Sequence, residues 1–577
     1  MTGSRTPGRV SDAVRAGALG FVLGLALGVV DGALVLHAEP ALAGAFLRRL
    51  GTMAVALAID GVALAGVFIA AALVVPVLRR PTSRVAIGAL AGGAAVAVFA
   101  AVAIAWVGPD GRSDDGTDRP NVLLISIDTL RPDRLSVYGH DRETSPRLDG
   151  LARSGVLFEQ ARSTASWTLP AHASMLTGLE AMSHGAIGHR DALSTDLVTL
   201  AERFRDAGYW TGAWVGTDTY GYVGADFAFD QGFALYAHQR LPRRHLGSLL
   251  ARRLERAHRR IALGFLGNAE VQVDAMVDWL EGQRRTPFFA FLHLYDVHSR
   301  FEGLPYRAPE PFSERFCGDT AEDYDGCADG KCASDRLAAM TAGAPPPPRD
   351  EIDDMLCHYD GAIAYVDAEL GRLFDRLEAL GLADRTIVVV TSDHGEAFFE
   401  HGLPLHVTLH EEVGRIPLII RAPGVVSGKR ATGSVGLVDL APTILELAGL
   451  DPMADVDGVS LASDLLDWRG RTDRPRMMVT SEASATALVE GRFKLIETRS
   501  KTGAEPVVEL FDLEADREER RDRVRVDSDR AMRMRRALRE RLAQAEARRA
   551  RHAGEALEIE PSERQRDELR ALGYSVD

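Results

Sequence analysis

The sequence predicts an α/β protein in which a mostly parallel central sheet carries helices on both faces. Strand and helix patterns alternate from about residue 120 onward, and this alternation is typical of a parallel sheet covered by helices. The segment 121–128 is a continuous apolar run, as expected for a strand that is buried on both faces. Three long apolar stretches precede this domain, and two short strand patterns with a charged helix follow it.

The three apolar stretches predict three transmembrane helices, because about 20 apolar residues cross a bilayer. They cover residues 16–36, 52–78 and 85–107. A signal peptide is the alternative for the first stretch, but no small-residue cleavage site follows it. Arginines flank these stretches on the side that the positive-inside rule requires, although Arg48 and Arg49 lie in the opposite loop. We therefore expect a multi-pass protein of the cell membrane whose residues after Trp106 are extracytoplasmic.

The remaining chain is expected to consist of a linker, a main domain and a C-terminal part. A polar, glycine-rich stretch after the third span is typical of a linker. The predicted boundaries are 1–108 for the membrane region, 109–119 for the linker, 120–470 for the main domain, and 471–577 for the C-terminal subdomain with its charged helical tail. Two segments, about 240–265 and 310–350, are interpreted as insertions into the main domain.

Charge and cysteine content narrow the class of protein. The net charge of -15 argues against a nucleic-acid partner, since phosphate backbones favour clustered Lys and Arg. All four cysteines, at positions 317, 327, 332 and 357, fall in one region of the exported part. One or two disulfides are expected there, and a zinc site is the alternative, although the spacing is not a repeated CxxC pair.

Each expected element has a local reason. The segment 145–155 opens with a Ser-Pro pair and closes with Gly, which predicts a helix. An amphipathic pattern predicts a second helix at 363–380, and a β-branched apolar run predicts a strand at 386–393. The further predictions are a strand at 416–421, a helix at 440–448, strands of a small antiparallel sheet at 491–497 and 509–513, and a charged helix at 527–553.

Polar side chains stand where two of the predicted strands end. Asp128 follows the first strand, and the pair Asp393-His394 follows the strand that begins at Thr386. Ligands of open α/β sheets bind at the carboxyl ends of the strands, so these side chains are candidate metal ligands. Carboxylates together with an imidazole suit Zn or Mn, whereas an all-oxygen shell suits Ca or Mg.

Thr168 stands at the start of a short predicted helix that contains Pro170 and ends at Gly178. A threonine in this position usually caps the helix through its hydroxyl. The functional alternative is a nucleophile whose alkoxide is stabilised by a metal and by the helix dipole. The local sequence alone leaves both interpretations open and favours the cap.

Several motifs together resemble the sulfatase family of the alkaline phosphatase superfamily. They occur in the family's order and span most of residues 120–517. The motifs are Ile125-Ser-Ile-Asp-Thr-Leu-Arg131, the helix from Thr144 to Gly155, the segment from Thr168 to Gly178, Tyr359-Asp-Gly-Ala-Ile-Ala-Tyr-Val-Asp367, Thr391-Ser-Asp-His-Gly-Glu396, Val438-Asp-Leu-Ala-Pro-Thr443 and Gly491-Arg-Phe-Lys-Leu-Ile. The resemblance implies an ester-cleaving enzyme.

The chain departs from the family pattern at the residues that would carry the chemistry. Sulfatases have a Cys or Ser, oxidised to formylglycine, two residues before the proline and an Arg two residues after it; this chain has Thr168 and His172. Oxidation of Thr gives a ketone, not the aldehyde that sulfatase chemistry requires, so no formylglycine is expected. The second acid of the first strand is replaced by Thr129, and a substrate-binding Lys is replaced by His406. The segment Gly216-Thr217-Asp218-Thr219 lacks the family's other Lys and His.

These departures resemble the phosphoethanolamine and phosphoglycerol transferases, which use a Thr nucleophile and also carry membrane helices. This resemblance implies that Asp128, Thr168, Asp393 and His394 bind a first divalent metal, Zn or Mn in preference to Ca or Mg. It also implies that Asp296, His298 and His406 bind the substrate or a second ion. We expect Thr168 and His172 to be the catalytic residues, with one or two ions in the site.

The predicted function is a membrane-anchored, metal-dependent hydrolase of phosphate or sulfate esters, with phosphoesters favoured by Thr168. One alternative is a true sulfuric ester hydrolase. Another is a phosphoethanolamine- or phosphoglycerol-type transferase that acts on envelope lipids or glycans. A non-catalytic envelope protein that uses this fold for binding is a third, and it is disfavoured because Asp128, Thr168 and the Asp393-His394 pair are present together.

Overall fold

A computed structural model describes the main domain and most of the C-terminal part. The described residues are 119–216, 222–238, 268–282, 286–298, 306, 308–317, 345–468, 474–480, 483–500 and 503–552. The three predicted transmembrane stretches, the insertion at 240–265, Cys327 and Cys332 lie outside these residues. Within the ranges just given, no helix combines the length and apolar character needed to cross a membrane.

The main sheet contains nine strands in the order β11-β2-β10-β6-β1-β5-β3-β4, with β9 paired to β2. Only β9 and β10 run against the direction of the others, so the sheet is mixed but mostly parallel. The strands are β1 (Asn121–Ile127), β2 (Val156–Arg162), β3 (Trp210–Val215), β4 (Leu235–His238), β5 (Phe288–Leu294), β6 (Thr386–Thr391), β9 (Arg415–Ile416), β10 (Leu418–Arg421) and β11 (Lys429–Gly436).

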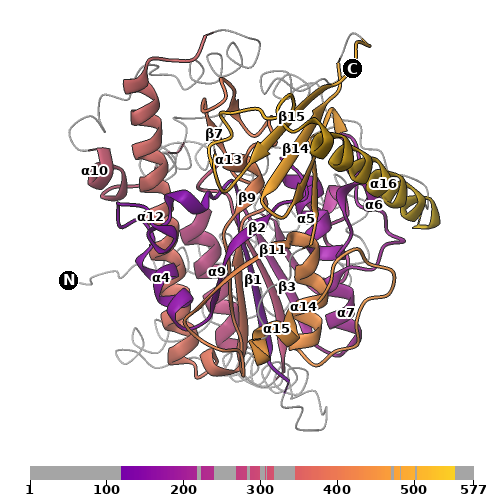
Figure 1. Ribbon diagram of the computed structural model, residues 1–577. Helices are drawn as coiled ribbons and strands as arrows, with labels where there is room; N and C mark the ends of the chain where they lie inside the picture. Colours follow the sequence, from indigo (N-terminus) through magenta and orange to yellow (C-terminus); the bar gives the residue numbers. More distant parts are fainter. Residues whose placement is uncertain are drawn as a thin grey trace, which may run out of the picture. The chain divides into compact units, whose positions relative to one another are not determined.

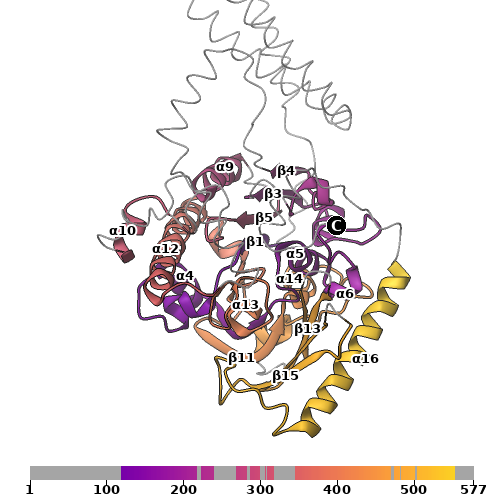
Figure 2. The ribbon, with the colours of Figure 1, turned by 90° about the horizontal axis from the view of Figure 1, so that it is seen from above.

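Helices cover both faces of this sheet, as the alternating pattern predicts (Figures 1 and 2). Alternate residues of each central strand point to opposite faces, and the two faces belong to separate apolar clusters. One face packs on α4 (Pro146–Arg153), α9 (Asn268–Gly282) and α12 (Arg349–Ala379). The other packs on α5 (Thr168–Thr177), α7 (Leu200–Asp206), α14 (Leu440–Leu447) and α15 (Ala462–Asp467). The α/β class is confirmed.

Two elements differ from their predicted bounds for identifiable reasons. The strand expected at 416–421 is divided into β9 and β10 by Pro417, which has no N–H to donate to a ladder. The helix expected at 363–380 begins at Arg349, directly after the prolines, and it packs on α10 (Phe312–Cys317) around Cys357 and Gly361. A disulfide between Cys317 and Cys357 joins these two helices, so these cysteines form a bridge and not a zinc site.

The C-terminal part forms the small antiparallel sheet that the sequence predicts. Its strands are β12 (Arg476–Val479), β13 (Ala485–Glu490), β14 (Phe493–Thr498) and β15 (Val507–Asp512), in that order. The charged helix α16 (Ser528–His552) packs along β13, β14 and α6 (Ala181–His184), as Figure 2 shows. Smaller elements are β7 (Ala397–Phe398), β8 (Pro404–Leu405) and α13 (Glu411–Gly414).

The C-terminal sheet supports the segment that leads into α5. Val479 of β12 exchanges backbone hydrogen bonds with Thr164 and Ser166, each 3.0 Å long. Arg476, at the start of the same strand, forms a buried ion pair of 2.7 Å with Asp439, from the Val438–Thr443 motif. Asp439 also accepts hydrogen bonds from the backbone N–H groups of Gly436 and Val459. The ion pair therefore joins β12 to the turn before α14.

We predict that Arg476→Ala lowers the free energy of unfolding by about 3–5 kcal/mol, because it leaves the buried Asp439 carboxylate without its cation. Arg147→Ala is the matched control, since Arg147 forms the corresponding pair with Asp375 at the surface. Denaturant unfolding of both variants measures the difference. Equal losses from the two substitutions would contradict a structural role for the buried pair.

Candidate active site

Two fully buried carboxylates lie side by side at the carboxyl ends of adjacent strands. Asp128 directly follows β1, and Asp393 follows β6, the parallel neighbour of β1. Asp393 Oδ1 accepts hydrogen bonds from the backbone N–H groups of Thr129 (3.3 Å) and His394 (2.8 Å). Burial raises the pKa of Asp393, but the neighbouring His394, His172 and His293 outweigh it and hold that pKa below its usual range. Asp393 is therefore an anion that requires positive charge nearby.

His394 presents one ring nitrogen to both carboxylates. Its Nδ1 lies 2.9 Å from the carbonyl oxygen of Gly395, and since a carbonyl only accepts, Nδ1 carries the proton. The other nitrogen, Nε2, lies 3.3 Å from Asp393 Oδ2 and 3.8 Å from Asp128 Oδ1. Among the described residues, neither His394 Nε2 nor Asp393 Oδ2 has a hydrogen-bond partner.

Thr168 faces the same carboxylates from the N-terminal end of α5. Trp167 occupies the cap position, and Thr168 is the first residue of the helix. The Thr168 hydroxyl makes no capping hydrogen bond and instead donates to Asp128 Oδ2 at 3.4 Å. The helix-cap interpretation of Thr168 is therefore wrong, and its hydroxyl is directed at the predicted metal ligands. The positive end of the helix dipole favours an alkoxide at this position.

His172 lies one helical turn after Thr168 and is fully buried. Its Nδ1 donates to the Thr168 carbonyl oxygen at 2.8 Å, so its Nε2 accepts from the Ser126 hydroxyl at 3.0 Å. Burial lowers the pKa of His172 to about 3, and the ring is neutral near pH 7. Both nitrogens are thus occupied by groups of the protein, an arrangement that suits a residue positioning Thr168.

The turn after Asp128 has a strained backbone. Thr129 has a φ of +56°, a value that β-branched residues rarely adopt. Its hydroxyl donates to the Val297 carbonyl at 3.1 Å, and its own carbonyl accepts from the Tyr359 hydroxyl at 2.6 Å. These bonds hold the conformation in which the Thr129 N–H reaches Asp393. The Thr129 side chain points away from the carboxylates, so it does not replace the missing second acid.

A second group of side chains lies beside the first and consists of His298, Glu396 and His406. All three are buried, and their ligand atoms lie within 4.8 Å of one another. The His406 ring is 4.6 Å from the His394 ring and 5.3 Å from the His298 ring, measured between centroids. Burial lowers the pKa of His406 to about 4. The predicted residues His298 and His406 therefore do come together, next to the first group.

The sequence predicts Asp296 together with His298 and His406, and the structure brings Glu396 to these two histidines. Asp296 is buried, and its charge acts on Tyr365 of α12. Glu396 belongs to the Asp-His-Gly-Glu motif and was not singled out, although a glutamate two residues after a predicted ligand was an available signal. His293, one residue before the end of β5, was also missed; its Nε2 lies 3.2 Å from Asp128 Oδ2.

The arrangement of donors fits a divalent metal. Asp128, Asp393 and His394 place one ligand atom each within 4.8 Å of one another. Ligands that sit about 2.0–2.2 Å from zinc are roughly 3.0–3.6 Å apart, close to the spacings of 3.3–3.8 Å around His394 Nε2. A metal ion would satisfy the buried Asp393 Oδ2 and His394 Nε2 together. The chemistry of the donors, two carboxylates and an imidazole, suits Zn or Mn.

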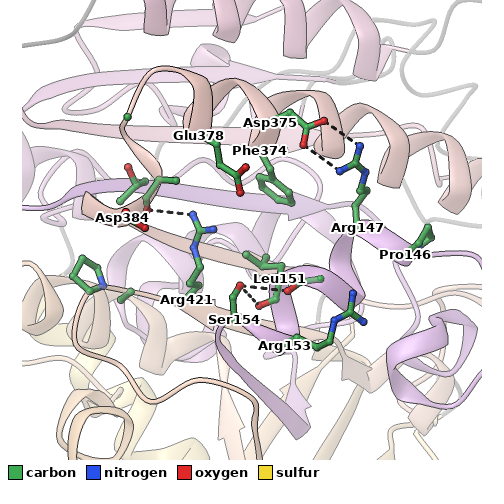
Figure 3. Close-up of a pocket in the computed structure, with 16 residues that line it drawn as sticks. Pro146, Arg147, Leu151, Arg153, Ser154, Phe374, Asp375, Glu378, Asp384 and Arg421 are labelled. Atoms are coloured by element: carbon green, nitrogen blue, oxygen red, sulfur yellow. Dashed lines mark hydrogen bonds and ion pairs between the residues drawn. The ribbon is translucent and has the colours of Figure 1, made fainter.

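A separate cavity of about 810 Å³ lies at the amino end of β6, opposite to the strand ends that carry Asp128 and Asp393 (Figure 3). Its arginines face carboxylates: Arg147 pairs with Asp375 at 3.0 Å, and the charges of Glu378 and Asp384 act on Arg421. No histidine lines this cavity. It therefore lacks the imidazoles that the active site combines with its carboxylates.

Comparison with known proteins agrees with this geometry. The sulfatase family model matches residues 120–450, and the model of the C-terminal domain of N-sulphoglucosamine sulphohydrolase matches residues 399–548. Arylsulfatase K of Gallus gallus is 26% identical over 444 residues, which cover 70% of this chain and 78% of that protein. A multifunctional alkaline phosphatase superfamily protein of Trinickia caryophylli is 28% identical over 413 residues, covering 61% and 79% respectively.

The crystal structure of phosphonate monoester hydrolase from Agrobacterium radiobacter has a similar fold, with a TM-score of 0.59 and 24% identity. The match covers 76% of this chain and 97% of that chain.

We predict that Asp393→Asn lowers the affinity for Zn²⁺ by more than about 100-fold, because it removes a charged ligand and not an outer partner. Metal content after dialysis and calorimetric titration measure the effect. Asp367→Asn is the control, since Asp367 is equally buried but accepts hydrogen bonds from the backbone of α4. Unchanged zinc binding by the Asp393 variant would rule out the metal centre assigned to this group.

Proposed function

This chain belongs to the sulfatase family of the alkaline phosphatase superfamily, and from that premise we propose that it cleaves phosphate esters with Thr168 as its nucleophile. The observation that carries the proposal is the Thr168 hydroxyl, which does not cap its helix and donates to Asp128. Family membership supports the coarser function, a hydrolase of sulfate or phosphate esters. The choice of phosphate and of a Thr nucleophile is specific to this chain.

In the first step of the proposed reaction, each buried residue has a separate role. The oxygen of Thr168 attacks phosphorus, a Thr168–phosphorus bond forms, and the bond to the leaving alcohol breaks. Asp128 Oδ2 is the acceptor nearest to the hydroxyl proton. His172 holds the Thr168 backbone by donating a hydrogen bond to its carbonyl oxygen. The N-terminus of α5 stabilises negative charge on the attacking oxygen. A divalent metal, when bound, would polarise the phosphoryl oxygens and lower the pKa of the nucleophile.

The second step releases the phosphoryl group. A water molecule attacks phosphorus, the bond to Thr168 breaks, and the threonine oxygen regains a proton, so the net reaction consumes one ester and one water. An acceptor alcohol in place of water would make the enzyme a transferase. His298 and His406, whose rings lie 5.3 Å apart and of which His406 is 4.6 Å from His394, are in our proposal the residues that bind the ester oxygens or hold a second ion. The same role for Asp296 stays a prediction from the sequence.

Thr168 also argues against the usual chemistry of the family. A threonine carries a methyl group on Cβ, and its oxidation gives a ketone, so we propose an enzyme without formylglycine. We further propose that the three apolar stretches anchor the protein in the cell membrane with the catalytic domain outside the cytoplasm. This location would suit an ester of an envelope lipid or glycan.

A true sulfatase is the second candidate, and the relatives favour it. Arylsulfatase K of Gallus gallus and choline-sulfatase of Rhizobium meliloti both match about 70% of this chain, at 26% and 25% identity. In this case sulfate would replace phosphate at the same residues, with Thr168 again as the nucleophile.

We expect the full-length protein, purified in detergent with Zn²⁺ or Mn²⁺, to cleave an aryl phosphate ester faster than an aryl sulfate. Thr168→Ala should lower this phosphoesterase rate at least about a thousandfold, because it removes the attacking atom. Parallel assays on an aryl phosphate monoester, an aryl phosphodiester and an aryl sulfate measure the preference.

Thr168→Ser is the control for this assay, since it keeps a hydroxyl at the same atom and should retain measurable activity. Faster cleavage of the sulfate ester would establish the second candidate. Undiminished activity in Thr168→Ala would exclude Thr168 as the nucleophile in either case.

A further inference from the structure

His293 occupies a place in the site that the family motifs do not assign. It is the penultimate residue of β5, which pairs in parallel with β1, and its Cα is in register with that of Ser126. The backbone N–H of Asp128 donates to the carbonyl of the next residue, Leu294, at 2.9 Å. The sheet itself therefore brings His293 beside Asp128. The side chain is buried, with 1% of its surface exposed.

The orientation of the His293 ring is fixed by Gly216, which follows β3. The ring Nδ1 lies 2.7 Å from the Gly216 carbonyl oxygen and so carries the proton. The backbone N–H of Gly216 donates in return to the His293 carbonyl at 2.8 Å. A Cβ at position 216 would lie 3.1 Å from the His293 carbonyl oxygen and 2.6 Å from the end of the Gln272 side chain, so a larger residue would crowd this contact. The ring is held with Nε2 directed at Asp128.

This arrangement is the same as that of the predicted ligand His394. Each histidine donates its Nδ1–H to a backbone carbonyl, of Gly216 or of Gly395, and presents Nε2 to a buried carboxylate. Histidines that bind metals characteristically anchor the other ring nitrogen in this way, because the anchor fixes both tautomer and orientation. His172 differs, since its two nitrogens are used by Thr168 and Ser126.

A positive charge is required between His293 Nε2 and Asp128 Oδ2, which lie 3.2 Å apart. With the proton on Nδ1, both facing atoms are electron-pair donors, and they repel each other without a cation. A proton on Nε2 would serve Asp128 alone. It would not reach Asp393 Oδ2 or His394 Nε2, two atoms that lack a hydrogen-bond partner in the described part of the chain. The ligand atoms of His293 and Asp393 lie within 4.8 Å of each other, as do those of Asp128, Asp393 and His394, so a cation beside Asp393 would lie near both histidines.

We propose that His293 is a further metal ligand, which adds a second imidazole to the Asp128–Asp393–His394 group. This inference rests on the proposed metal-dependent function. The separation of 3.2 Å between His293 Nε2 and Asp128 Oδ2 falls within the roughly 3.0–3.6 Å between neighbouring ligands of one zinc ion. Two imidazoles with carboxylate and hydroxyl oxygens favour Zn²⁺, Mn²⁺ or Co²⁺ strongly over Ca²⁺ and Mg²⁺. His293 thus helps to determine which metal the site accepts.

The test is the visible absorption spectrum of the full-length protein loaded with Co²⁺, whose d–d bands report the number and type of ligands. We expect His293→Gln to shift these bands and to lower the affinities for Co²⁺ and Zn²⁺ by more than about 100-fold. His184→Gln is the matched control, because His184 is also buried and hydrogen-bonded. Its partners are Ser174, Pro170 and Ala186, none of which is assigned to the metal site. It should leave the Co²⁺ spectrum unchanged.

The outcomes separate this inference from the proposed function. Bands that keep their positions in His293→Gln would overturn the ligand assignment, and an affinity loss within about 10–100-fold would then identify an outer partner of Asp128. Zinc binding that is lost in Asp393→Asn but preserved in His293→Gln would likewise overturn it while the metal centre stands. Failure of the wild-type protein to bind Co²⁺ or Zn²⁺ would contradict the metal-dependent function as well. A thermal unfolding midpoint close to that of wild type shows that the variant is folded.

Discussion

The carboxylates of Asp128 and Asp393 are buried side by side, and most features of the site follow from the need to neutralise them. Two such anions, taken out of water, are costly unless positive charge and hydrogen bonds compensate for their burial. The structure supplies backbone N–H groups to Asp393 and surrounds the pair with three imidazoles, His172, His293 and His394. The donor atoms of Asp128, Asp393 and His394 lie within 4.8 Å of one another, and we interpret this group as one that a divalent cation from solution would neutralise.

The position of Thr168, the proposed nucleophile, depends on elements outside the site. Thr168 reaches the carboxylates because β12 of the C-terminal sheet holds the segment before α5 through Thr164 and Ser166. Thr129 adopts a strained backbone conformation on the other side, so that its N–H meets Asp393. Both features lie outside the catalytic group itself, and both orient it. The C-terminal subdomain therefore contributes to the active site without providing any of its ligands.

Much of the fold could be predicted from the sequence, because the information for it is local. The apolar run of β1, the Ser-Pro start of α4 and the charged pattern of α16 each define an element by themselves. The early start of α12 was not predicted, since it depends on packing against α10 and on the bond between Cys317 and Cys357. The proximity of His298 and His406 followed from the family resemblance and not from any local pattern.

The residues that were missed are those whose role depends on neighbouring strands. His293 stands inside the apolar sequence of β5, where a single histidine is indistinguishable from a hydrogen-bonded core residue. Only the pairing of β5 with β1 places it beside Asp128. Glu396 lies with His298 and His406 in one group, and the chain turns at Leu405, with a φ of +62°, directly before His406.

The departures from the family pattern are concentrated at the reacting atoms, while the scaffold is retained. Pro170, the Asp393-His394 pair and the strands that carry them match the family, whereas Thr168, His172 and His406 do not. A fold can host different chemistries when the side chains at one site change. We interpret this chain as an example, in which a hydroxyl nucleophile and imidazoles replace the aldehyde hydrate and the cationic side chains of a sulfatase.

The most direct test of the proposed metal centre is anomalous X-ray diffraction at the zinc absorption edge from crystals of the zinc-loaded protein. We expect a peak among Asp128, Thr168, Asp393 and His394, at bonding distance from both carboxylates. A single peak among His298, Glu396 and His406, with none beside Asp393, would contradict it.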